Sequence, residues 1–105
     1  MRATEIMPRA LRRELESVGR GIAIARRRRR ISIDLMLQRT GLSKRTYQQV
    51  EKGMPTVAMA AYAMALNALG LAGNLALLAD PTKDEAGQLL EAESLPKRIR
   101  QRGSP

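Results

Sequence analysis

The segment from Ser32 to Gly53 constrains the fold of this chain most strongly, because its turn residues and caps divide it into two short helices. Gly41 stands where a first helix has to end, since glycine adopts the left-handed conformation of a helix C-terminus without steric cost. Ser43, two residues later, is a favourable N-cap for a following helix. The sequence therefore predicts two short helices that are separated by a tight turn.

The second of these helices presents polar and basic side chains opposite its apolar residues. Helical periodicity places Leu42, Tyr47 and Val50 on the apolar face. Arginine can form two parallel hydrogen bonds with guanine, and glutamine can do so with adenine. An ordinary solvated helix face would explain any one of the outward residues, but their joint position after a glycine turn is typical of helix-turn-helix proteins that read DNA. The residues of this segment that we expect to contact DNA are Ser32, Ser43, Lys44, Arg45, Thr46, Gln48, Gln49 and Lys52.

The same segment resembles the helix-turn-helix of the Cro and lambda-repressor (XRE) family, whose pattern runs S-Q-x-x-L-A-x-x-x-G-h-S-x-x-x-h-x-x-h-E-x-G with h apolar. Ile33 replaces a glutamine that helps to hold a DNA phosphate in that family, and Leu37 replaces an alanine at which the two helices pack. The second difference implies a wider helix crossing or a local repacking. The positions that match or substitute acceptably are Ser32, Met36, Gly41, Leu42, Ser43, Tyr47, Val50, Glu51 and Gly53.

The charge of the chain favours a polyanionic partner. Among 105 residues, 19 are lysine or arginine and 10 are aspartate or glutamate, which gives a formal charge of +9. The first 30 residues hold ten arginines and three acids, whereas residues 53–79 hold no charge. The five consecutive arginines at 26–30 exceed what the solvated end of a helix needs, although cations do favour a helix C-terminus. We therefore expect some of them to contact DNA phosphates, with Arg26, Arg29 and Arg30 as the candidates.

Composition argues against several other classes of protein. Cysteine and histidine are absent, so neither a disulfide framework nor a zinc site is expected from the usual ligands, and the chain suits a reducing cytoplasm. No nucleophile has an activating base at a useful spacing, so we expect neither enzymatic activity nor a cofactor. The longest apolar run, Val57–Leu66, is too short to span a membrane, and no secretory signal stands out. A cytoplasmic protein without a membrane segment is expected.

Hydrophobic spacing predicts an all-α chain. Its helices are expected over residues 8–29, 33–39, 43–52, 57–69, 72–79 and 84–93, with Thr56 capping the fourth and Pro96 ending the sixth. Together with the resemblance, this indicates a compact five-helix domain similar to that of lambda repressor over residues 8–80, followed by a helical or mobile C-terminal tail over 81–105.

A chain of this length is too small to bury every apolar residue that follows the fourth helix. Once that helix packs on the first three, four leucines of the fifth helix remain without a place in the core. We therefore expect the fifth helix to supply much of a two-fold homodimer interface. These residues are Leu71, Leu75, Leu77 and Leu78.

The C-terminal stretch LADPTKDEAGQLLEAESLPKRIRQR resembles the corresponding part of HipB-like antitoxins, which are small XRE-type regulators encoded beside HipA-like kinase toxins. The resemblance implies a homodimeric repressor that binds double-stranded operator DNA in its own promoter and docks a HipA-like kinase toxin. Two alternatives stay open. One is a stand-alone XRE-type transcriptional regulator without a toxin partner, and the other is a non-DNA interaction module with a degenerate helix-turn-helix.

Overall fold

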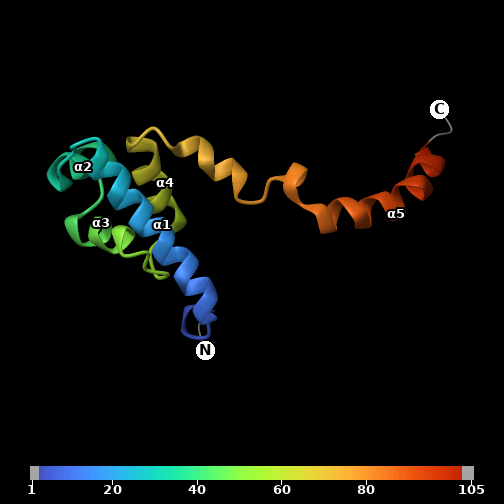
Figure 1. The fold of residues 1–105 in the computed structure, drawn as a ribbon, viewed down its shortest axis with the longest axis horizontal. Helices are drawn as coiled ribbons and strands as arrows, with labels where there is room; N and C mark the ends of the chain where they lie inside the picture. The colour runs from blue at the N-terminus through green and yellow to red at the C-terminus, as the bar shows by residue number, and fades with distance from the viewer. Residues whose placement is uncertain (1–2, 103–105) are drawn as a thin grey trace. The chain divides into compact units, whose positions relative to one another are not determined.

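The computed structural model describes the backbone of residues 3–102 and, within it, the side chains of residues 3 and 5–94 (Figure 1). Helices alone make up the regular structure of this range, which confirms the all-α prediction for the described residues. The chain divides between Gly73 and Asn74 into two compact units. The elements are η1 (Ala3–Glu5), α1 (Arg9–Arg28), α2 (Ile33–Thr40), α3 (Lys44–Glu51), α4 (Met59–Ala68), η2 (Ala72–Leu77), η3 (Pro81–Lys83) and α5 (Glu85–Arg102), where η denotes a 3-10 helix.

The turn between α2 and α3 has the geometry that its sequence predicts. Gly41 adopts a left-handed conformation with φ of 73°, and its N–H donates to the carbonyl of Leu37 at 2.9 Å. The hydroxyl oxygen of Ser43 accepts a hydrogen bond from the N–H of Thr46 at 3.1 Å and so caps α3. Ser32 caps α2 in the same way, through the N–H of Leu35.

The fourth helix begins later than predicted. It starts at Met59 with Ala58 in the N-cap position, so the predicted cap at Thr56 is wrong. The hydroxyl of Tyr62 donates to the carbonyl of Met54 at 2.7 Å, and this bond holds the preceding segment as a loop against the helix.

Two C-terminal predictions were also wrong. The expected α-helix over residues 72–79 is the 3-10 helix η2, because Gly73 and Asn74 have low α-helix propensity. Helix α5 continues through Pro96 to Arg102, whereas the sequence predicted that Pro96 would end it. A proline removes one backbone hydrogen bond from a helix, which interrupts the helix only when the flanking residues do not sustain it.

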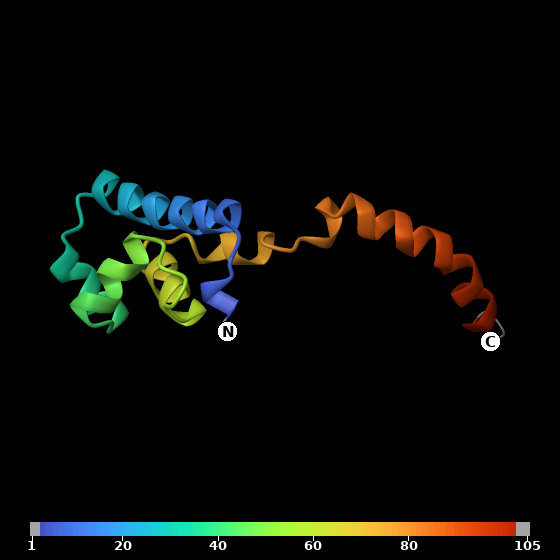
Figure 2. The ribbon, with the colours of Figure 1, turned by 90° about the horizontal axis from the view of Figure 1, so that it is seen from below.

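The core of the first unit lies between four helices. Figure 2 shows α1 along one side of this unit, with α2, α3 and α4 on the other. The largest fully buried side chains are Ile22 of α1, Met36 of α2, and Tyr47 and Val50 of α3. From α4, Ala61 and Ala65 complete the same cluster. Because α3 contributes its inner face to this core, its opposite face is held toward solvent.

Helices α1 and α3 approach each other through two buried glycines. A Cβ atom added to Gly19 would lie 2.6 Å from the carbonyl oxygen of Glu51, and one added to Gly53 would lie 2.6 Å from the carbonyl carbon of Leu15. Both distances are far below normal van der Waals contact, and the atoms they meet belong to the backbone. The exposed Gly21 of α1, in contrast, has nothing within 4 Å of its added Cβ.

This difference predicts opposite effects for two identical substitutions in α1. Gly21→Ala should raise the free energy of unfolding by about 0.5–1 kcal/mol, because alanine favours the helix and meets no neighbour. Gly19→Ala should lower it by about 1–3 kcal/mol, because the added methyl group forces α1 away from α3. Urea unfolding followed by circular dichroism measures both values. Equal stabilities for the two variants would contradict the close approach of the two helices.

Candidate nucleic-acid interface

The outer face of α3 is polar and largely accessible. Lys44, Arg45, Gln48 and Lys52 at the end of the helix are exposed, and Gln49 is half-buried. These side chains stand away from the buried face, so the structure brings the predicted base-contacting residues together on one surface. A helix face of this composition can donate to guanine and pair with adenine in the major groove of DNA.

The hydroxyl residues of the segment already have partners in the protein. Ser43 accepts the cap hydrogen bond described above and also donates to the hydroxyl oxygen of Thr46 at 3.0 Å. Ser32 accepts from the N–H of Leu35 at 3.0 Å. Their oxygens therefore serve the helix ends first, although the hydroxyl hydrogens of Thr46 and Ser32 are left free by these bonds to donate to a phosphate.

Arg26 is not available for the phosphate contact that the sequence predicted for it. Its Nε donates to Oε2 of Glu51 at 2.7 Å, and its guanidinium also donates to the carbonyl of Ile31 at 3.0 Å. The side chain turns inward because Arg26 lies four residues after the core residue Ile22, on the same face of α1. That spacing was the sequence signal for its structural role.

A buried tyrosine completes this polar cluster. The hydroxyl of Tyr47 donates to Oε2 of Glu51 at 2.5 Å, so the carboxylate of Glu51 accepts from both α1 and its own helix. Burial, with the hydrogen bond to Glu51, raises the pKa of Tyr47, and the hydroxyl stays a neutral donor. The hydrogen bond to the Glu51 carboxylate raises the pKa of Arg26. The cluster joins the C-terminal ends of α1 and α3.

The four arginines after Arg26 are all exposed. Arg27 and Arg29 donate to the carbonyl oxygens of Ala23 and Ala25 at the end of α1, at 3.3 and 2.9 Å. The side chains of Arg28 and Arg30 form no hydrogen bond or ion pair within the described part of the chain. Arg28 was absent from the predicted contacts, although helical periodicity already turned it away from the core.

Arg30 occupies a backbone position that normally favours glycine. Its φ of 53° is the one positive value among the described residues other than glycine. Its N–H donates to the carbonyl of Arg27 at 3.0 Å, and the next N–H, of Ile31, donates to Arg26 at 3.1 Å. These two bonds form a Schellman turn, in which a left-handed residue ends the helix. A residue with a side chain pays about 1–2 kcal/mol there relative to glycine, so Arg30 places a cation at a strained position.

The charge of the protein lies in its first unit. Residues 1–73 contain 14 lysines and arginines and five acidic residues, so the entire formal charge of +9 falls there. Residues 74–105 contain five residues of each sign and are neutral overall. A polyanion would therefore be attracted to the unit that presents the outer face of α3.

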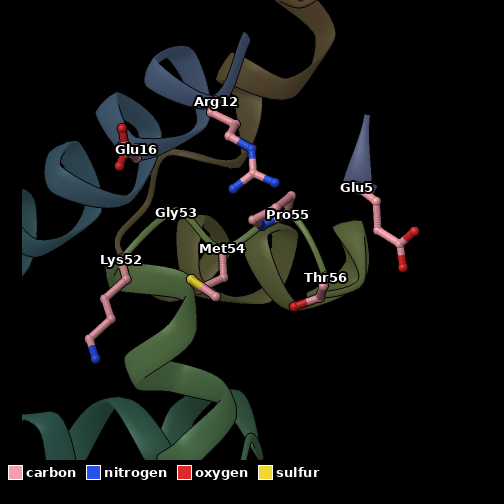
Figure 3. Close-up of a pocket in the computed structure, with 8 residues that line it drawn as sticks. All are labelled: Glu5, Arg12, Glu16, Lys52, Gly53, Met54, Pro55 and Thr56. Carbon is pink, nitrogen blue, oxygen red and sulfur yellow. The ribbon is translucent and has the colours of Figure 1, made fainter. Parts of the chain in front are cut away.

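A surface hollow lies between the N-terminal half of α1 and the segment that follows α3 (Figure 3). Arg12 extends from α1 toward Pro55, Glu16 comes from the same helix, and Lys52 stands at the end of α3. The lining thus mixes both signs of charge and does not have the single sign that would concentrate an anion.

The four leucines predicted at a dimer interface have different surroundings. Leu71 packs against the core of its own unit, because the left-handed Gly70 turns the chain back and lets the N–H of Leu71 donate to Leu66 at 2.8 Å. It is therefore not the uncovered residue that the sequence predicted. Leu75 is half-buried, while Leu77 and Leu78 are 54% and 66% exposed.

Comparisons with protein-family models, with curated proteins and with solved structures found no match to this chain. Within the described residues, no helix has the length and apolar character needed to cross a membrane. The same part of the chain has no group of three or more acidic residues arranged to hold a metal ion.

The polar cluster predicts two unequal losses of stability. Glu51→Gln should lower the free energy of unfolding by about 1–3 kcal/mol, because it leaves the largely buried guanidinium of Arg26 without its counter-charge. Tyr47→Phe should cost about 0.5–1.5 kcal/mol, since it removes one hydrogen bond and keeps the ion pair. Chemical denaturation of both variants gives the comparison. A larger loss for Tyr47→Phe would show that the ion pair is not what holds α1 and α3 together.

Proposed function

We propose that this protein is a sequence-specific double-stranded DNA-binding regulator that represses transcription, with α2, the Gly41 turn and α3 acting as a helix-turn-helix. The observation that carries the proposal is the exposed polar face of α3, which follows a capped glycine turn in a unit that holds the whole net charge. The function requires no catalytic step and no cofactor.

In this proposal α3 lies in the major groove of the duplex. Arg45, Gln48 and Gln49 contact base edges, because their side chains have the donors and acceptors that distinguish base pairs. Lys44 and Lys52, at the two ends of the same face, contact phosphates. The half-burial of Gln49 restricts its side chain, which favours a specific contact over a mobile one.

The arginines at the end of α1 supply contacts to the phosphate backbone. Arg28 and Arg30 are exposed and unengaged, so they bring charge to a phosphate without breaking an internal bond. The ion pair between Arg26 and Glu51 ties this end of α1 to α3. Arg26 is thus a positioning residue, because it couples the backbone-contacting arginines to the helix that reads bases.

The partner of the second unit is a narrower proposal. A HipA-like kinase toxin is expected from the resemblance of the C-terminal stretch alone. A stand-alone regulator would need only the first unit, since α3 and the end of α1 both belong to it. Both versions share the homodimer and the operator DNA that we propose.

Base contact predicts a selective loss of affinity. An operator is first obtained by selecting duplexes from a random pool with the full-length protein. Arg45→Ala or Gln49→Ala should then weaken binding to that operator by about 1–3 kcal/mol and relax the preference at one base pair. Arg13→Ala, which removes a charge from the exposed surface of α1, serves as the control and should keep the preference. If the variants of α3 and the control select the same sequences, α3 does not read bases.

The strained position of Arg30 predicts a gain in stability with a loss of binding. Arg30→Gly should raise the free energy of unfolding by about 1–2 kcal/mol, because glycine adopts the positive φ without strain. It should also weaken binding to operator and random duplex alike, and the log–log salt slope should fall by about 0.9 if one phosphate contact is lost. Arg13→Gln is the matched control for charge. A variant that is more stable but binds DNA with an unchanged slope would exclude Arg30 from the interface.

A further inference from the structure

Helix α4 is apolar on both of its faces, yet only one face is covered. Ala61 and Ala65 point into the core of the first unit and are buried. On the opposite face, Met59 is 64% exposed and Met64 is 41% exposed. A helix that is apolar all round is normally buried all round. The outer face of α4, formed by Met59, Ala60, Ala63, Met64 and Asn67, therefore lacks a partner within its unit.

Charge identifies the partner that fits this face. Residues 53–79 contain no charged side chain, although the unit around α4 carries +9. A second copy of the chain brings the same positive charge, so most approaches between two copies set like charges against each other. At the outer face of α4, two copies can meet without removing a charge from water, which is the costly step in burying a polar interface.

We propose that two copies of this chain associate through the outer face of α4, related by a two-fold axis. The inference deepens the proposed function, because it names the surface at which the two copies of the DNA-binding dimer meet. Ala60 and Ala63 are short enough to let the two helices approach closely, and the flexible Met59 and Met64 fill the space on either side. The contact is isologous, since each copy offers the same residues.

Asn67 gives this surface a means of orientation. Its side chain is exposed and forms no hydrogen bond within the described part of the chain. An asparagine near a two-fold axis can pair with its own counterpart, and such a polar pair selects one register of an otherwise apolar contact. The leucines first predicted for the interface fit less well, because Leu71 belongs to the core and Leu77 and Leu78 belong to the second unit.

Sedimentation of the full-length protein without DNA tests the proposal. The wild type should sediment as a dimer, whereas Met64→Glu and Ala60→Glu should yield monomers, because each would place two carboxylates together in the interface. Glutamate is a good helix former, so both variants should keep their helical circular dichroism. Ile24→Glu is the matched control: Ile24 is 45% exposed on α1, and its variant should remain dimeric.

Disulfide trapping supplies a second, independent measurement. The chain has no cysteine, so a single introduced thiol can react only with its counterpart in another copy. Asn67→Cys or Ala63→Cys should give a covalent dimer on mild oxidation, since disulfides form only when the two Cα atoms lie within about 7 Å. Ile24→Cys should stay monomeric on a non-reducing gel.

Three results would overturn the proposal. A wild-type protein that is monomeric at every concentration would show that α4 is covered by another part of its own chain or by a different partner. A dimer that Met64→Glu leaves intact would place the interface elsewhere, and dissociation by Leu78→Glu alone would place it in the second unit. DNA binding is measured separately by selection from a random pool. A dimer through α4 that binds no duplex would refute the proposed function and support this inference.

Discussion

The ion pair between Arg26 and Glu51 is the interaction on which the arrangement of the first unit depends. It joins the last turns of α1 and α3, and Tyr47 donates a third hydrogen bond to the same carboxylate. The two helices could not come this close at Gly19 and Gly53 if either carried a side chain. A wide polar link at one end and glycine contacts along the backbone together fix how α3 stands on the core. The direction of its outer face follows from that placement, because a helix can turn its polar side outward only when its inner side is held.

The end of α1 combines features that oppose each other energetically. Five adjacent arginines repel one another, and one of them, Arg30, occupies a left-handed position that glycine would take without strain. The structure relieves part of this repulsion, since Arg26 pairs with Glu51 while Arg27 and Arg29 donate to helix carbonyls. The charge that is left uncompensated, on Arg28 and Arg30, has no evident benefit for folding. A phosphate backbone would give it one, which links the least stable feature of the turn to the proposed binding of DNA.

The surface of the first unit is divided between two kinds of chemistry. Positive charge gathers on the end of α1 and the outer face of α3, whereas α4 and its flanking loops carry none. Electrostatic attraction acts over distances of about 8–10 Å in salt and brings a polyanion to the first surface. Apolar contact has no such reach and requires close fit, so the second surface is suited to a partner of matching shape. The proposals for DNA and for a second copy of the chain rest on these separate surfaces, and they can therefore fail separately.

The sequence by itself determined the elements that depend on neighbouring residues. Gly41 and Ser43 set the turn between α2 and α3 through local hydrogen bonds, and apolar spacing correctly placed Tyr47 and Val50 in the core. Only the tertiary structure decided the fate of residues whose partners lie far along the chain. Arg26 became a structural ion pair because Glu51 reaches it from α3, Leu71 entered the core because Gly70 turns the chain back, and α4 kept an open outer face because η2 did not form the expected helix. Local hydrogen bonds and periodicity are written in consecutive residues, whereas burial depends on which distant segment arrives to cover a side chain.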